Sequence, residues 1–327
     1  MHAPPTVTVI IVAYNSGAYL QACVAALAAQ TFGAFEAVIA DNASTDGSIA
    51  ALVLPDSRFR IEAMVANLGF AAANNRVAQT SDAAFLALLN PDTVAEPDWL
   101  AALIDCAAQH PTAVGIGSRQ IRLHAPGILD GVGDVWHMAG LVWRAGEGWP
   151  VARAPATQEI FSPCAAAALY RREAFLEVGG FDARFFCYCE DVDLGFRLRA
   201  AGGVLLHCAE ARIAHAGSGV VGRASEFSRF YGHRNRIFLF LKHTPQPWFA
   251  LLLAYHLIWN AVILLDACRR GDAHVMWRAY RAAFARWREF RAEAAQPTRK
   301  AAFAKLLPLL AAWPWSPITR PLVPGRN

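Results

Sequence analysis

A near-continuous run of aliphatic residues at positions 7–12 (VTVIIV) constrains the fold of this chain more than any other feature. Runs of this kind are typical of a parallel strand that is buried on both faces of a sheet. Further strands are predicted at residues 35–40, 60–65 and 84–89, and helical segments separate them, the first at residues 17–29. Strands that alternate with helices at this spacing predict βαβ units, and therefore an α/β fold with a doubly wound sheet.

Polar side chains follow each of these strands at the point where it ends. Tyr14 and Asn15 come after the first strand, Asp41 follows the second, and Asn67 and Asn90 follow the next two. In open α/β sheets, ligands bind beyond the carboxyl ends of the strands. The sequence therefore predicts a ligand site at this edge of the sheet.

Glycine-rich phosphate-binding loops are missing from the place where they would be expected. Neither GxxxxGK[ST] nor GxGxxG follows the first strand, and no GxSxG motif occurs in the chain. A bound nucleotide would therefore be held by side chains, together with a metal ion. Sugar nucleotidyltransferases share this type of sheet, and they are one class that such a chain could belong to. They would place a Gly- and Arg-rich loop after the first strand, where this chain has AYNSGAYL.

The tripeptide Asn90-Pro91-Asp92 presents two oxygen-bearing side chains directly after the strand at residues 84–89. A carboxylate at this place suits a hard divalent cation that takes its other ligands from water and a diphosphate. An Asx-Pro turn explains the same residues equally well. Asp41 is likewise either a turn residue or a hydrogen-bonding partner of a base or ribose.

Residues 185–199 (FFCYCEDVDLGFRLR) combine two cysteines with three carboxylates at the start of a predicted helix. Zinc binding by the two cysteines is disfavoured, because the nearest further ligands, His207 and Cys208, lack the usual two-plus-two spacing. Acidic residues at a helix start stabilise its free N–H groups and its dipole, so Asp191 and Asp193 can serve as caps. This does not exclude the other reading, in which one carboxylate acts as a general base.

The charge is distributed unevenly along the chain. Residues 1–222 hold 13 Lys and Arg against 21 Asp and Glu, whereas residues 223–327 hold 17 against 5. Within this basic tail, residues 248–265 are apolar over almost the length of a membrane-spanning helix, although they include His256 and Asn260. Four aromatic residues then recur at helical spacing on one predicted face: Trp277, Tyr280, Phe284 and Trp287.

This tail favours a basic amphipathic helix at an anionic membrane surface, and its hydrophobicity argues against nucleic acid as the partner. Two ordinary helices packed on the body of the protein are the alternative. Residues 123–159, rich in Gly, Trp and Pro, predict a long surface excursion. We expect an α/β domain at residues 1–225 and a C-terminal basic, hydrophobic helical region at residues 226–327.

Taken together, six motifs resemble those of family 2 glycosyltransferases, in the order typical of that family over residues 6–240. They are VTVIIVAYNSGAYL, ADNASTDGS, NLGFAAANN, LLNPDT, GGFDARFFCYCEDVDLGFRLRAAGG and HAGSG. The chain looks especially similar to bacterial rhamnosyltransferase-type members. The resemblance implies a GT-A fold, a dTDP- or UDP-sugar donor, Mg²⁺ or Mn²⁺, and inversion at the anomeric carbon.

The resemblance also assigns donor-binding candidates at the strand ends. Tyr14 and Asn15 lie where the first strand meets the nucleotide, and Asp41 matches the aspartate that contacts the base. Three asparagines are expected near the donor: Asn67, Asn74 and Asn90.

Metal-binding and catalytic candidates follow from the same resemblance. Asp92 matches the last position of the DxD motif, and His215 matches a histidine that completes the metal shell. Asn90 replaces the first aspartate of that motif, so we expect a weaker or water-mediated contact there. Asp191 matches the second member of the acidic pair that supplies the base, and Glu190 is the second candidate for this role.

The function that the resemblance implies is metal-dependent transfer of a hexose, rhamnose in the first instance, to a lipid-linked or polysaccharide acceptor in cell-envelope glycan synthesis. The basic tail adds an expected location at the cytoplasmic face of the inner membrane, peripheral or monotopic. The alternative from another class is a catalytically silent, glycosyltransferase-like membrane subunit.

Overall fold

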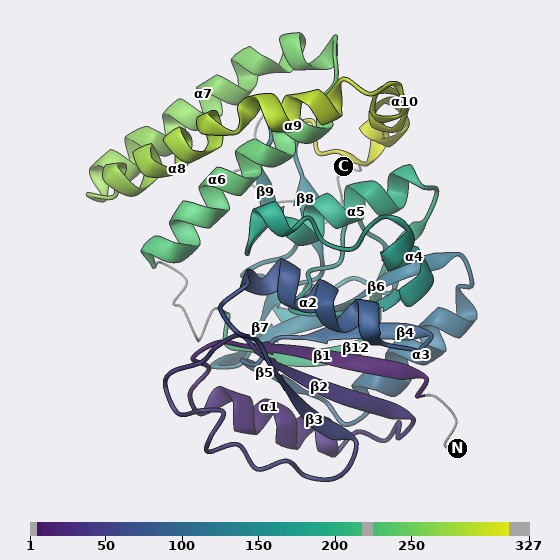
Figure 1. The fold of residues 1–327 in the computed structure, drawn as a ribbon. Coiled ribbons are helices and arrows are strands. Elements are labelled where there is room, and N and C mark those ends of the chain that lie inside the picture. The colour runs from purple at the N-terminus through teal and green to yellow at the C-terminus, as the bar shows by residue number, and fades with distance from the viewer. Residues whose placement is uncertain (1–4, 218–224, 314–327) are drawn as a thin grey trace.

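The computed structural model describes residues 5–217 and 225–313 and shows a mixed sheet with helices on both faces (Figure 1). The strands of this sheet are β1 Val7–Ala13, β2 Phe35–Asp41, β3 Phe59–Ala63, β4 Phe85–Leu89, β5 Thr93–Ala95, β6 Ala113–Arg122, β7 Ala125–Gly131, β10 Gln158–Glu159, β11 Ala167–Arg171 and β12 Val204–His215. Their order is β10-β12-β6-β11-β4-β1-β2-β3, with β5 paired to β12 and β7 to β6.

The four strands predicted from the aliphatic runs are β1 to β4, and they pair in parallel. Strand β1 is buried along its whole length, because helices cover it from both sides. Helices α1 (Tyr19–Ala28) and α3 (Trp99–Gln109) pack on one face. Helices α2 (Gly69–Thr80), α4 (Arg172–Glu177) and α5 (Glu190–Ala200) pack on the other. The predicted α/β fold is confirmed.

Residues 123–159 are not the surface excursion that their composition predicted. They form β7, the hairpin of β8 (Asp134–Trp136) and β9 (Val142–Arg144), the short helix η1 (Val151–Arg153) and β10. Leu129, Val135 and Trp143 lie in a hydrophobic cluster against which Trp259 of helix α7 (Trp248–Arg269) packs. Local composition does not predict this burial, because the burial depends on contacts with a helix about a hundred residues later in the chain.

The C-terminal region forms a layer of helices next to α5, at the top of Figure 1. It comprises α6 Glu226–His243, α7, α8 Ala273–Ala285, α9 Trp287–Ala294, α10 Pro297–Leu306 and η3 Leu307–Leu309. Val192 and Phe196 of α5 share a hydrophobic cluster with Phe238 of α6, Phe290 of α9 and Phe303 of α10. The tail is therefore packed directly on the helix that begins with the acidic residues.

Helix α7 is 22 residues long, with a mean hydropathy of 1.9, and only 11% of its most apolar window is buried. By length and composition alone, it could cross a membrane. The predicted outward face of four aromatic residues is only partly correct. Trp277, Phe284 and Trp287 are exposed, but Tyr280 is half-buried and its hydroxyl donates to the carbonyl oxygen of Asn260 over 2.9 Å.

Candidate active site

A cavity of about 590 Å³ opens beyond the carboxyl ends of β1 and β4, the edge at which the sequence placed a ligand site. Segments far apart in the chain supply its walls, which include the start of α5, the β8–β9 hairpin, the end of β12 and helix α6. Its charged and titratable lining residues include Asp92, Asp134, Arg144, Cys164, Glu190, Asp191, His215, Arg229, His233 and Arg236.

Asp92 and His215 meet at this cavity because β5, which follows Asp92, pairs with the end of β12. Nε2 of His215 lies 3.3 Å from Oδ1 of Asp92, and both side chains are almost completely buried. On the other side of the ring, Nδ1 lies 2.8 Å from Oδ2 of Asp130, which also accepts a hydrogen bond from Arg144. Burial lowers the pKa of His215, although the neighbouring Asp92 carboxylate opposes that shift.

These residues fit a divalent cation. Oδ1 of Asn90 is buried without a hydrogen-bond partner, and Nε2 of His215 has the Asp92 carboxylate as its neighbour. Asn90, Asp92 and His215 all line the cavity. Carboxylate, amide and imidazole groups are suitable ligands for Mg²⁺ or Mn²⁺, the imidazole more so for Mn²⁺. Asp130 contacts the far nitrogen of the imidazole, as the outer-shell carboxylates of metal sites commonly do.

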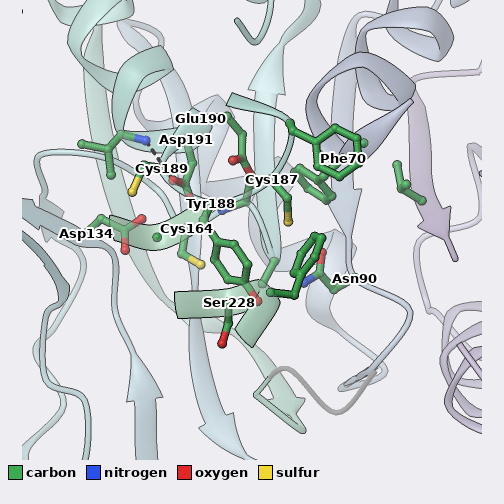
Figure 2. A pocket seen from close by; sticks show the side chains of 18 of the residues that line it. Phe70, Asn90, Asp134, Cys164, Cys187, Tyr188, Cys189, Glu190, Asp191 and Ser228 are labelled. Atoms are coloured by element: carbon green, nitrogen blue, oxygen red, sulfur yellow. Dashed lines mark hydrogen bonds between the residues drawn. The ribbon is translucent and has the colours of Figure 1, made fainter. Parts of the chain in front are cut away.

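The acidic pair lies at the start of α5, and both carboxyl groups line the cavity (Figure 2). Asp191 accepts hydrogen bonds from the backbone N–H groups of Ala165, over 3.2 Å, and Val192, over 2.9 Å. Burial raises the pKa of Asp191, and these hydrogen bonds and the charge of Arg144 oppose that shift. Glu190 is also buried, with no hydrogen-bond partner for Oε2, and burial and Asp191 raise its pKa well above the usual range.

Asp134 is a third cavity carboxyl, which the sequence did not suggest. Figure 2 shows Asp134, Cys164 and Asp191 converging from separate segments, and one ligand atom of each lies within 4.8 Å of the others. Burial, and then the adjacent Asp191, raise the pKa of Asp134 well above the usual range, and the two carboxyl groups are hydrogen-bonded. A neighbouring carboxylate disfavours ionisation, so Asp134 keeps a proton more readily than an isolated carboxyl group. An acidic residue alone within an apolar stretch, GVGDVW, was the only local signal.

Asp193 is neither a helix cap nor a cavity residue. Its side chain is fully buried on the far side of α5, 2.6 Å from Nζ of Lys242, 2.8 Å from Nε2 of His243 and 2.7 Å from Nη2 of Arg197. Burial opposes ionisation, but the charges of Arg197 and Lys242 and the hydrogen bond from His243 hold the pKa of Asp193 well below its usual range. The third carboxylate of the motif therefore fastens α5 to the C-terminal helices.

The loop before the acidic pair has an unusual backbone. Phe186, Tyr188 and Cys189 have φ angles of 66°, 72° and 65°, a left-handed region that costs energy for residues with a side chain. Nδ2 of Asn235 in α6 donates to the carbonyl oxygens of Phe185, Cys187 and Tyr188, over 2.8, 2.8 and 2.7 Å. One buried amide thus holds the loop that presents the catalytic candidates.

The two cysteines of this loop are not grouped with other metal-ligating side chains among the described residues. Among the described residues, the group of side chains close enough to hold a metal contains Cys164 with Asp134 and Asp191, and neither Cys187 nor Cys189 belongs to it.

Of the donor-binding candidates, Tyr14, Asn67 and Asn90 line the cavity, whereas Asn15, Asp41 and Asn74 do not. Asn15 accepts a hydrogen bond from the backbone of Thr45, and Asp41 accepts one from Ser44, so both organise the loop after β2. Asn74 is completely buried in α2 and donates to the carbonyl oxygen of Phe70. The strand-end position of Asn15 and Asp41 was predicted correctly, but their side chains are used for turns.

This chain belongs to glycosyltransferase family 2 and is a glycosyltransferase: the sequence profile described as Glycosyl transferase family 2 matches residues 8–179. A related protein is the N-acetylglucosaminyl-diphospho-decaprenol L-rhamnosyltransferase of Mycobacterium tuberculosis, 32% identical over 76% of this chain and 88% of that protein. The O-antigen biosynthesis protein RfbC of Myxococcus xanthus is 32% identical over 64% of this chain, but only 17% of its own length.

Solved structures show the same GT-A architecture at low sequence identity. The mannosyltransferase PcManGT from Pyrobaculum calidifontis, in complex with GDP-Man and Mn²⁺, matches 93% of this chain and 88% of its own, with a TM-score of 0.56 and 18% identity. GalNAc-T7 with UDP, GalNAc and Mn²⁺ matches 75% of this chain and 49% of its own, with a TM-score of 0.57 and 16% identity. At these identities, the likeness concerns the fold.

Proposed function

We propose that this glycosyltransferase transfers a hexose, rhamnose in the first instance, from a dTDP- or UDP-sugar to a hydroxyl group of a lipid-linked acceptor, with inversion and with Mg²⁺ or Mn²⁺ as cofactor. The similarity to a rhamnosyltransferase whose name specifies a decaprenyl diphosphate acceptor supports the sugar and the acceptor class. The reaction belongs to cell-envelope glycan synthesis.

One observation carries the proposal. A single cavity brings together a metal-binding pair at the sheet edge, Asp92 and His215, and a carboxyl pair on a separate helix, Glu190 and Asp191. Inverting transfer needs both, because the acceptor is deprotonated on the side of the sugar opposite the leaving diphosphate.

Asp191 is the proposed general base. Two backbone N–H groups fix the orientation of its carboxylate, and Arg144 favours its ionised form. Its proton comes from the acceptor hydroxyl as that oxygen attacks the anomeric carbon. Glu190 is less suited, since no hydrogen bond to Oε2 holds it and its neighbour disfavours its charge.

Asp92 and His215 would hold the divalent cation, with the Asn90 amide oxygen as a direct or water-mediated ligand. Such a cation offsets the negative charge that develops on the leaving diphosphate. Asp130 and Arg144 keep the imidazole of His215 oriented, and Tyr14 and Asn67 line the part of the cavity next to β1 where the nucleotide would lie.

The C-terminal helices give the enzyme a surface suited to a membrane. On α7, large apolar side chains face outward, including Leu257 at 57%, Ile258 at 60% and Leu265 at 59% exposure. Exposed Arg269, Arg270, Arg278 and Arg281 lie on or next to the same helices. Apolar area flanked by cations favours an anionic bilayer, so we propose a peripheral or monotopic location at the cytoplasmic face of the inner membrane.

The catalytic proposal is tested by donor turnover. Purified full-length protein is incubated with Mg²⁺ or Mn²⁺, a prenyl-diphosphate-linked sugar and a panel of nucleotide sugars, and the released nucleoside diphosphate is measured. dTDP-rhamnose should give the fastest release. Failure of every donor to be turned over would contradict the enzymatic proposal and favour the catalytically silent membrane subunit.

Membrane association is tested separately by flotation with phosphatidylglycerol-containing vesicles. Replacing Trp277 and Phe284 by serine should weaken binding, because both side chains are exposed on α8. The matched control is Val53→Ser, which alters a 70% exposed apolar residue on the sheet domain. Equal binding of all variants would remove α8 from the proposed membrane surface.

A further inference from the structure

The cavity has a basic end that the proposed donor and metal residues leave unexplained. Arg229, His233 and Arg236 line it, and all three belong to α6. Their spacing of four and three residues puts them on one face of the helix. This face is separate from the sheet edge, where Asp92 and His215 lie.

Arg236 is the central residue of this basic end and is only 5% exposed. Its Nε donates to Nδ1 of His233 over 3.1 Å, and Nη2 donates to Oδ1 of Asn260 over 2.7 Å. Nη1 is buried without a well-aligned hydrogen-bond partner, although the hydroxyl of Tyr280 lies near the guanidinium, and within residues 5–217 and 225–313 no carboxylate forms an ion pair with it. A buried charge without a counter-ion is costly, so an anionic partner is expected.

The surroundings of Arg236 add to the positive potential. Burial, followed by the charges of Arg236, Arg270 and Arg229, lowers the pKa of His233 to about 3. Arg229 and Arg270 each have a carboxylate partner, Asp272 at 3.3 Å and Asp266 at 2.8 Å. The uncompensated charge of the cluster therefore lies at Arg236, the member that is most deeply buried.

We propose that this face of α6 is a phosphoryl-binding subsite for the diphosphate of a lipid-linked acceptor. The assignment rests on the proposed function, which places the donor diphosphate at Asp92 and His215. Guanidinium groups bind phosphoryl oxygens through paired N–H donors, and Arg236 has one such donor unused.

The position of the subsite explains why the acceptor is the better match than the donor. Arg236 is hydrogen-bonded to Asn260 of α7, the helix whose outer face exposes Leu257 and Ile258. A diphosphate bound at Arg236 would thus lie between the carboxyl group of Asp191, in the same cavity, and a surface suited to a lipid chain.

The subsite is tested by isothermal titration of the full-length protein with inorganic pyrophosphate in EDTA, which leaves the proposed cation site unloaded. Arg236→Gln should weaken pyrophosphate binding by roughly tenfold or more, the effect of losing a charged hydrogen-bonding group. Arg288→Gln is the matched control, because it removes one positive charge from an exposed position on α9 outside this cavity. Arg229→Gln, at a half-buried position of the same face, gives a second measurement if Arg236→Gln fails to fold.

A second titration distinguishes the two possible sources of the diphosphate. Arg236→Gln should bind dTDP with Mn²⁺ as tightly as the wild type, while the KM for a prenyl-diphosphate-linked acceptor rises. An equal loss of dTDP affinity would assign Arg236 to the donor site and overturn the proposal. Pyrophosphate affinity that is unchanged in Arg236→Gln would overturn it as well. These results are separable from failure of the proposed function, which would appear as absence of donor turnover in the wild type.

Discussion

The two ends of the cavity differ in charge and in origin. The acidic end is built from strand ends of the sheet, the β8–β9 hairpin and the start of α5, and contains Asp92, Asp134, Glu190 and Asp191. The basic end is one face of α6, within the region predicted as a tail. The C-terminal helices therefore complete the cavity, instead of forming a tail separate from it.

Contacts of α6 outside the cavity also connect its two ends. Lys242 of α6 neutralises Asp193 of α5, His243 hydrogen-bonds to the same carboxylate, and Asn235 of the same helix holds the loop before α5. Arg234, next to Asn235, donates to the carbonyl oxygens of Arg184 and Phe185. Helix α6 therefore both carries the basic end and positions the acidic one.

The largest effect expected at the acidic end is that of Asp191→Asn. Loss of the general base should lower kcat by roughly 10²- to 10⁴-fold, while nucleotide binding is retained. Asp105→Asn, at an exposed position on α3, is the control for loss of one carboxylate. A wild-type kcat in Asp191→Asn would rule out Asp191 as the general base and favour Glu190 in that role.

The next effect concerns the cation. Asp92→Asn removes the carboxylate beside Nε2 of His215, and should weaken Mn²⁺-dependent binding of dTDP by about tenfold or more. Titration of dTDP with and without Mn²⁺ measures this directly. The control is Asp98→Asn, an exposed neighbour whose side chain makes no capping hydrogen bond. If the variant keeps the wild-type Mn²⁺ dependence, the cation is held elsewhere.

The acidic end could be predicted from the sequence further than the basic end. Aliphatic runs at residues 7–12 and 84–89 are local signals, and topology then brings Tyr14 and Asp92 to one edge. Asp130 and Asp134 had no such signal. They act on His215 and Asp191 across 85 and 57 positions of chain, through strands whose burial needs α7.

The sequence also does not show which basic residues of α6 line the cavity. Arg234 and Arg236 flank Asn235 in one short motif, RNR, and have the same side chain. In the structure, Arg234 contacts backbone carbonyls and Arg236 lines the cavity. Residues two positions apart on a helix lie on different faces. The packing of α6 on α5 and α7 therefore decides which of the two arginines faces the cavity.

The connection between the two ends can be broken at Asn235. Asn235→Ala removes three hydrogen bonds to buried carbonyl oxygens, and should lower the free energy of unfolding by about 1–3 kcal/mol. Because the loop presents the acidic pair, kcat should fall while the affinity for dTDP stays unchanged. Thermal unfolding and steady-state kinetics measure both effects, and Gln79→Ala, exposed on α2, is the control. A destabilised variant that keeps the wild-type kcat would show that Asn235 stabilises the fold but is not needed to position the acidic pair.

The smallest effect expected is a shift in pH dependence from Asp134. Burial raises the pKa of Asp191, so kcat/KM should rise with pH through a pKa above the ordinary carboxyl range. The hydrogen bond from protonated Asp134 lowers the pKa of Asp191, as does the charge of Arg144. Asp134→Leu removes that donor and should move the acid limb up by about one pH unit, the equivalent of one charged hydrogen bond. Asp134→Asn keeps an N–H donor and should leave the limb near its wild-type position. Profiles of kcat/KM between pH 5 and 9 check this, and an equal shift in both variants would show that a hydrogen bond from Asp134 does not lower the pKa of Asp191.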